Sequence, residues 1–145
     1  MTLEDLRILV VDDDANIRRL VELILGGVGV TQLRSVASAD EALTMLGAWR
    51  PDLLLVDYVM EGTDGIAFTR RIRETVDTPA RRLPIVIMTG YGELWRLDQA
   101  KRAGANEFLV KPFTAKALLM RIRRAASRAQ TLDERDRSRV VVTPQ

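Results

Sequence analysis

Short apolar runs alternate with segments of helical periodicity along most of this chain. Four runs are almost continuously apolar, over residues 7–11, 53–57, 84–88 and 107–110, and a weaker one covers 31–36. Strands buried on both faces of a parallel sheet have this composition. Between the runs, apolar residues recur three or four positions apart, as they do in amphipathic helices. We therefore predict an α/β fold in which five parallel strands alternate with five helices.

Residues that begin and end helices stand between these runs. Asp14 and Asp64 precede helical segments and are expected to cap them, and Ser38 with Glu41 forms a Ser-x-x-Glu capping box. Gly104 follows a helical segment over about 92–103 and is expected to end it. The last helix is predicted to start at residue 114. We predict one domain over residues 1–128 and a flexible polar tail over 129–145.

The 145 residues include neither cysteine nor histidine. This composition excludes disulfides, thiol nucleophiles, imidazole bases and the usual zinc ligands. The 22 basic and 20 acidic residues leave a net charge of +2, too small a surplus to indicate a nucleic-acid binder. No apolar stretch approaches the roughly 18 residues of a membrane span, and the first residues do not resemble a signal peptide. We expect a cytoplasmic protein whose chemistry depends on carboxylates, hydroxyls, lysine and a hard metal ion.

Four of the predicted strands end in side chains that can take part in chemistry. Asp12 and Asp13 follow the first strand, Asp57 ends the third, Thr89 follows the fourth and Lys111 the fifth. Each alone is more typical of a turn or a surface, but the carboxyl ends of parallel strands share one edge of the sheet, where ligands bind. Three neighbouring carboxylates repel one another unless a hard cation, Mg²⁺ or Mn²⁺, neutralises them. Without cysteine or histidine, the candidate nucleophile is a carboxylate, which indicates phosphoryl transfer to an aspartate.

Six motifs of the chain lie on or beside these strand ends. They are Ile8–Asp14 (ILVVDDD), Leu53–Met60 (LLLVDYVM), Asp64-Gly65, Met88-Thr89-Gly90, Gly104–Phe108 (GANEF) and Lys111-Pro112-Phe113. Together they resemble the receiver domain of two-component response regulators, and the single-domain chemotaxis type in particular. The resemblance covers roughly residues 6–126. It implies a flavodoxin-like, doubly wound (βα)5 parallel sheet with strand order 2-1-3-4-5.

The resemblance implies a role for each residue of the predicted site. Asp57 stands at the position of the phosphoryl acceptor, and Lys111 at that of the lysine that pairs with it. Asp13, Asp57 and the backbone carbonyl of Val59 are expected to bind Mg²⁺ directly, and Asp12 through water. The expected donor is a phosphohistidine on a sensor histidine kinase or a histidine phosphotransfer protein. The chain is then not an enzyme in the ordinary sense, because it catalyses only its own phosphorylation and dephosphorylation.

The resemblance also implies a switch. Thr89 is expected to move toward the phosphoryl group, Phe108 to follow it inward, and the Lys111–Pro112 bond to be cis. Val59 and Tyr91 occupy the two positions that control access of water to the acyl phosphate. Because both side chains are bulky and neither orients water, we expect slow autodephosphorylation.

The expected output is a change of partner affinity, or onward transfer of the phosphoryl group, by a stand-alone receiver. In this family the surface formed by the fourth helix, the fifth strand and the last helix carries that change. Here that surface offers Trp95, Arg96, Lys101, Arg121 and Arg124. We expect no DNA-binding domain and no membrane association. The predicted partners are the kinase, an unknown downstream protein and a second copy of the chain.

Three other interpretations stay open. A haloacid-dehalogenase-like phosphohydrolase would use Asp12 as its nucleophile and Asp14 as its acid or base, but it leaves Asp57 without a role. A phosphorylation-independent adaptor would not need Asp57. An anionic nucleotide could bind to the arginines of the last helix, because guanidinium groups suit phosphates.

Overall fold

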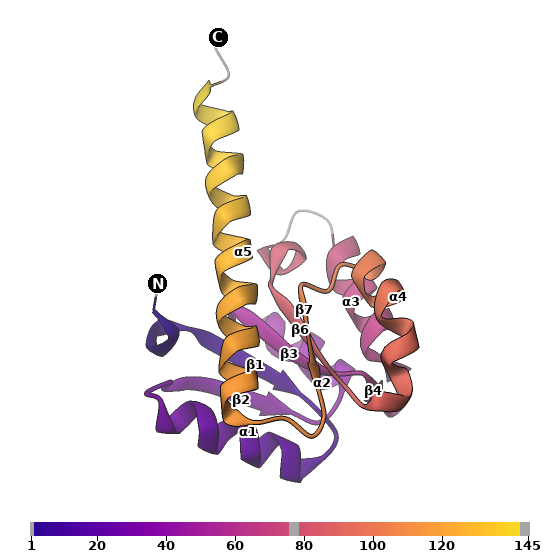
Figure 1. The fold of residues 1–145 in the computed structure, drawn as a ribbon. Coiled ribbons are helices and arrows are strands. Elements are labelled where there is room, and N and C mark those ends of the chain that lie inside the picture. Colours follow the sequence, from indigo (N-terminus) through magenta and orange to yellow (C-terminus); the bar gives the residue numbers. More distant parts are fainter. Residues whose placement is uncertain (1, 76–78, 143–145) are drawn as a thin grey trace.

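Five strands form one parallel sheet in the computed structural model (Figure 1), which describes residues 2–75 and 79–142, with the backbone alone for 79–80, 91 and 129–142. The strands are β1 (Arg7–Val11), β2 (Gln32–Val36), β3 (Leu53–Asp57), β6 (Ile85–Thr89) and β7 (Glu107–Val110). Their order is β2-β1-β3-β6-β7. This order confirms the predicted 2-1-3-4-5, because β4 (Val59–Met60) and β5 (Thr63–Asp64) pair only with each other, as a small antiparallel hairpin.

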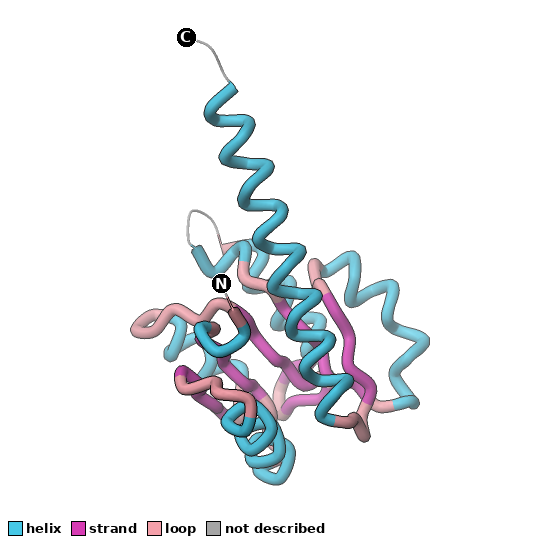
Figure 2. Tube along the Cα trace, turned by 60° about the vertical axis from the view of Figure 1, so that its left-hand side comes forward, coloured by secondary structure: helices cyan, strands magenta, loops and turns pink. Residues whose placement is uncertain are grey.

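Helices cover both faces of the sheet (Figures 1 and 2). On one face pack α2 (Ala39–Leu46), α3 (Gly65–Glu74) and α4 (Leu97–Ala103), and on the other α1 (Ala15–Gly27) and α5 (Ala115–Val142). Alternate strand residues point to opposite faces. Leu9 and Val11 therefore lie in the core beneath α2, α3 and α4, whereas Ile8 and Val10 lie beneath α1 and α5. Both faces of the central strands β1, β3 and β6 are buried, which explains why these strands are almost entirely apolar, whereas the edge strand β2 carries polar residues.

The helices begin and end where capping residues allow. Asp14 accepts a hydrogen bond from an N–H of the first turn of α1 at 2.9 Å, and Asp64 accepts one from α3 at 2.7 Å. The hydroxyl of Ser38 accepts from the first turn of α2 at 3.2 Å. Gly104 ends α4 in the left-handed region, with φ of 110°. These bonds satisfy backbone groups that a helix end otherwise leaves without partners, as the sequence predicts.

The segment before α4 differs from the prediction of one helix over about 92–103. Residues Tyr91–Arg96 form a 3-10 helix, here called η3, and α-helical bonding begins only at Leu97. No side chain caps α4, and Gly90 and Gly92 lie in or next to its expected first turn. Glycine has low helix propensity, so the tighter 3-10 turn forms instead. Two other 3-10 helices are η1 (Leu3–Asp5) and η2 (Pro79–Arg82).

Helix α5 continues beyond the predicted domain boundary at residue 128. Its backbone is helical to Val142, and it projects past the rest of the fold (Figures 1 and 2). The flexibility of residues 129–145 stays a prediction, and 143–145 lie outside the described residues. Within the described residues, no helix has both the length and the apolar character that crossing a membrane requires.

Candidate functional site

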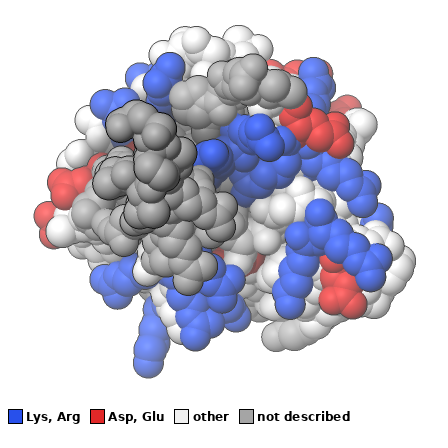
Figure 3. Space-filling view, turned by 90° about the horizontal axis from the view of Figure 1, so that it is seen from above, with Lys and Arg blue, Asp and Glu red and all other residues white. Residues whose placement is uncertain are grey.

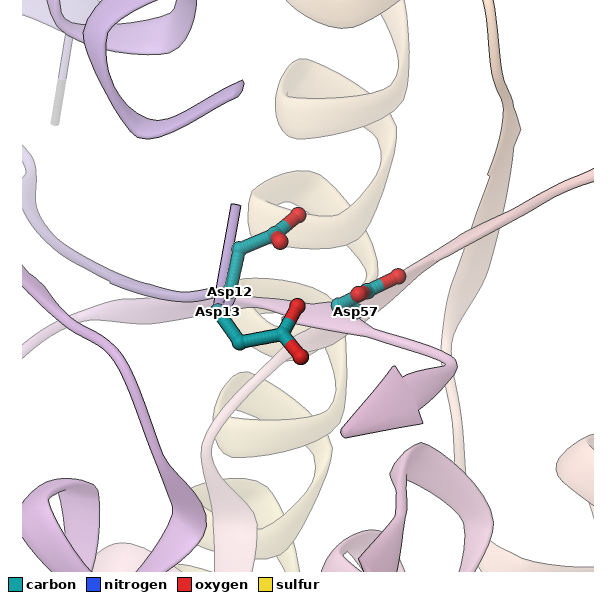
Figure 4. Close-up of side chains that lie close together, drawn as sticks. All are labelled: Asp12, Asp13 and Asp57. Atoms are coloured by element: carbon teal, nitrogen blue, oxygen red, sulfur yellow. The ribbon is translucent and has the colours of Figure 1, made fainter. Parts of the chain in front are cut away.

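Three carboxylates meet at the carboxyl ends of two adjacent strands (Figure 4). Asp12 and Asp13 follow β1 and Asp57 ends β3, and one oxygen atom from each lies within 4.8 Å of the other two. Asp12 and Asp57 are buried, whereas Asp13 is exposed. The cluster is therefore open to solvent on the side of Asp13. An all-oxygen donor set with an open side fits a hard divalent cation that keeps part of its water shell, such as Mg²⁺.

Lys111 connects two of these carboxylates. Its Nζ donates to Oδ2 of Asp12 at 2.9 Å and to Oδ1 of Asp57 at 3.0 Å. The backbone places it there, because its N–H donates to the carbonyl of Thr89 at 2.7 Å and so extends the pairing of β6 with β7. Burial of the ammonium group acts to lower the pKa of Lys111, but the two carboxylates outweigh burial and raise it. Lys111 therefore stays charged at this site.

The carboxyl group of Asp57 is harder to ionise than an ordinary aspartate. Its pKa is raised from 3.8 to about 6, mainly by burial and further by the negative charge of Asp12. The hydrogen bond from Lys111 and one from the backbone of Val59 act in the opposite direction but do not cancel it. At neutral pH Asp57 is still ionised, and it is more basic than an exposed carboxylate.

Asp12 is held by several hydrogen bonds. Its Oδ1 accepts from the backbone N–H of Asp14 at 2.9 Å, and its Oδ2 accepts from Lys111. Its own carbonyl accepts from the guanidinium of Arg18 at 2.6 Å, a contact that the sequence pattern did not indicate. With 0% exposure and both carboxylate oxygens in use, Asp12 is a poor candidate for a nucleophile.

The predicted switch residues lie on β6, which neighbours β3, and on β7, which pairs with β6 at the edge of the sheet. Thr89 ends β6, is 2% exposed, and its hydroxyl donates to the carbonyl of Gly90 at 3.3 Å. Phe108 lies on β7, is half-buried, and packs against the core beneath α2, α3 and α4. The Lys111–Pro112 peptide bond is cis, as the resemblance implies. The movement of Thr89 and Phe108 stays a prediction.

The loop after Asp57 brings other groups to the site. Val59 is 55% exposed, and the side chain of Tyr91 lies outside the described residues. Gly65 starts α3 directly beside Asp57: a Cβ at this position would lie 2.8 Å from the carbonyl oxygen of Asp57. Glycine is therefore required for α3 to approach this closely. The Asp64-Gly65 pair is the sequence signal for this approach.

The surface predicted to bind partners is not uniformly free. Trp95 is 76% exposed, but the guanidinium of Arg96 lies over the ring of Tyr58, 5.4 Å from its centroid. Arg121 pairs with Glu107 at 3.0 Å within the chain. The remaining members are both exposed: Lys101 and Arg124.

Comparison with known proteins agrees with this geometry. Residues 8–123 match the family model of the response regulator receiver domain. The chain belongs to the response regulator receiver family. It is 32% identical over 123 residues to the chemotaxis protein CheY of Pseudomonas aeruginosa, with 85% of this chain and 98% of CheY covered. A putative response regulator from Chloroflexus aurantiacus has a similar structure, with a TM-score of 0.75 and 34% identity over 83% of this chain and 96% of that one.

Other relatives of this receiver are longer and correct the predicted partners. The transcriptional regulatory protein ResD of Bacillus subtilis is 37% identical over 123 residues, which are 85% of this chain but 49% of ResD. The DNA-binding transcriptional regulator NtrC of Salmonella typhimurium is 36% identical over 121 residues, 83% of this chain and 25% of NtrC. The chain spans about half the length of several curated relatives that it matches.

The prediction of partners is therefore wrong where it excludes a DNA-binding domain, because receivers of this kind occur within regulators of transcription. The physical reason for the error is that a receiver is a self-contained fold. The residues that form this fold therefore do not reveal which output domain accompanies a receiver in its relatives. A histidine kinase is consistent with these relatives, whereas the predicted downstream protein and second copy are not tested by them.

Proposed function

We propose that this receiver accepts a phosphoryl group on Asp57 from a phosphohistidine of a sensor histidine kinase, in a transfer that depends on Mg²⁺. The supporting observation is the setting of Asp57, which is a buried and basic carboxylate in contact with Lys111 at 3.0 Å. It stands at an open edge of the sheet beside two more carboxylates. A nucleophile, a cation and a set of metal ligands thus meet at one point.

The transfer exchanges one bond for another. A carboxylate oxygen of Asp57 attacks the phosphorus, the P–N bond of the donor breaks, and the imidazole nitrogen takes the electron pair and a proton from solvent. Lys111 offers its charge to the phosphoryl oxygens that arrive beside it, and the hydroxyl of Thr89 donates to another. Asp13, Asp57 and the carbonyl of Val59 would hold Mg²⁺ directly and Asp12 would hold it through water, and the ion would neutralise charge on the phosphoryl oxygens. The receiver is thus a self-modifying acceptor and not an enzyme that acts on a separate substrate.

The setting of Asp12 argues against the phosphohydrolase interpretation. A nucleophile needs a free oxygen directed at its substrate, and both oxygens of Asp12 accept hydrogen bonds. In that interpretation Asp57 also has no task, although it carries the raised pKa. Perturbed titration together with a specific charge partner is typical of a reactive group.

Intact-protein mass measurement after incubation with acetyl phosphate and Mg²⁺ tests the proposal. We expect one phosphoryl adduct on the wild-type chain, none without Mg²⁺, and none on Asp57→Asn. Asp52→Asn is the matched control, because it removes an aspartate that bonds to the backbone of Arg7 and lies outside the site. An adduct retained in Asp57→Asn and lost in Asp12→Asn would refute the proposal in favour of the phosphohydrolase.

A further inference from the structure

Basic side chains gather at the edge of the sheet opposite to the carboxylate cluster (Figure 3), on the side where α5 projects. The end of α3, the helix η2, the last turn of α4, the start of β7 and the middle of α5 meet there. Arg73 joins three of these segments, because its guanidinium donates to the carbonyls of Gly104 and Arg81, each at 2.9 Å, and to the side chain of Asn106 at 2.9 Å. We define the basic face as Arg73, Arg81, Arg82, Lys101, Arg102, Arg121, Arg124 and Arg128.

Few acidic groups balance this face. Among the residues whose side chains the structure describes, these segments include two acids, Glu74 and Glu107. Glu107 is 4% exposed and is already shared between Arg121 at 3.0 Å and Arg128 at 2.7 Å. Within the described part of the chain, four exposed members of the face form no ion pair: Arg81, Lys101, Arg102 and Arg124. The net charge of +2 thus conceals a strongly positive face and a separate acidic cluster.

The composition of the basic face selects among anionic partners. Of the four exposed members that form no ion pair in the described part of the chain, three are arginines, whose planar guanidinium groups donate paired hydrogen bonds to phosphate oxygens. Among the described side chains, the exposed aromatic is Trp95, which lies on η3, outside the segments that form this face. Single-stranded nucleic acids are held largely by stacking on aromatic rings, and membrane surfaces by aromatic and apolar anchors, so the face suits neither. A duplex needs only cations and hydrogen-bond donors for its phosphates.

We propose that the basic face binds the phosphate backbone of duplex DNA without sequence preference. The contact uses a part of the fold that phosphoryl transfer does not use, since the two regions lie at opposite ends of the strands. The receiver domain then adds its own attraction to DNA to that of any protein to which it is bound. Because the contact involves phosphates only, its free energy comes from release of counterions and weakens steeply with salt.

Fluorescence anisotropy with a labelled random-sequence 20-base-pair duplex tests this proposal, using the unphosphorylated full chain without Mg²⁺. We expect a dissociation constant in the range of about 10⁻⁶ to 10⁻⁴ M at about 50 mM salt. The logarithm of the association constant should fall with log salt at a slope of about −3 to −4, for about four phosphate contacts. Lys101→Gln with Arg102→Gln should lower the affinity about tenfold and reduce the slope by about 2.

Arg19→Gln with Lys116→Gln is the matched control. It removes the same two charges from exposed positions on α1 and at the start of α5, outside the basic face, and should leave affinity and slope unchanged. Equal losses in both double variants would overturn the proposal, as would the absence of duplex binding at about 50 mM salt. Tighter binding to a single strand, or to vesicles with anionic headgroups, would assign the face to that partner instead. Far-ultraviolet circular dichroism and a thermal melt, each matching the wild type, verify that both variants fold and keep the result independent of the proposed function.

Discussion

Replacing Asp57, the proposed phosphoryl acceptor, should make this receiver more stable. Asp57 is buried next to Asp12, and its pKa is raised from 3.8 to about 6. The folded state therefore binds the proton more tightly than the unfolded state, and ionisation of Asp57 destabilises the fold. This penalty is absent below pH 3.8, grows as the pH rises to about 6, and is constant above that. A tenfold change in proton affinity is worth about 1.4 kcal/mol, so the full penalty is about 3 kcal/mol.

Asp57→Asn removes this penalty, while Lys111 keeps its hydrogen bond with Asp12. At pH 7.5 in EDTA, we expect the free energy of unfolding of the variant to exceed that of the wild type by about 2–3 kcal/mol. This difference corresponds to a rise of about 10 °C in the midpoint of thermal unfolding. The difference should shrink between pH 6 and pH 4, and added Mg²⁺ should stabilise only the wild type strongly. Circular dichroism melts from pH 4 to pH 8 measure both effects.

Asp13→Asn is the control for this experiment, because it makes the same chemical change at the exposed member of the cluster. It should gain much less stability than Asp57→Asn, since little desolvation is relieved there. A variant Asp57→Asn that is less stable than the wild type, or a difference that does not depend on pH, would refute the reasoning. The buried charge would then be compensated in the folded state by groups other than Lys111.

Three other changes have outcomes that the structure indicates. Glu107→Gln should lower the free energy of unfolding, measured in urea, by about 1 kcal/mol. Arg121→Ala with Arg128→Ala should lower it by about 3 kcal/mol, because only this change leaves a buried carboxylate unpaired. Equal losses in the two variants would contradict this reasoning. Gly65→Ala should destabilise the fold by about 1–3 kcal/mol and slow phosphorylation, since the new Cβ would lie 2.8 Å from the carbonyl oxygen of Asp57. An unchanged rate of phosphoryl adduct formation, followed by mass, would argue against this contact. Val59→Asn should shorten the lifetime of the phosphoryl adduct, because an amide at this 55% exposed position can orient water.

The residues of the candidate site could be placed from the sequence because a parallel sheet brings strand ends together. Asp57 lies 45 positions after Asp12, and Lys111 lies 54 positions after Asp57, yet each follows a recognisable apolar run. The parallel order of the strands then brings the three residues to one edge of the sheet. Cap residues such as Asp14 were equally accessible, since capping depends on neighbours along the chain.

Features made by short or distant contacts could not be predicted in this way. The hairpin of β4 and β5 has strands of two residues each, too short for any periodicity, and Gly62 with φ of 79° is its single local signal. The 3-10 helix η3 forms where no side chain caps the start of the segment, and the spacing of apolar residues carries no information about this. The basic face combines Arg73, Lys101 and Arg128 from three separate helices, whose ends become neighbours only through packing.

Helix α5 extends well beyond the rest of the fold, so a small tilt at its base becomes a large displacement at its far end. Residues 129–142 continue α5 for about 21 Å at 1.5 Å per residue. The base of this extension is tied down by Arg128, which bonds to Glu107 and to the carbonyl of Asn106 at 2.9 Å. A rotation of about 10° at that base displaces the far end by about 4 Å. A shift of β7, the strand that also carries Phe108, would therefore be magnified at the end of α5 if it tilted the base of the helix.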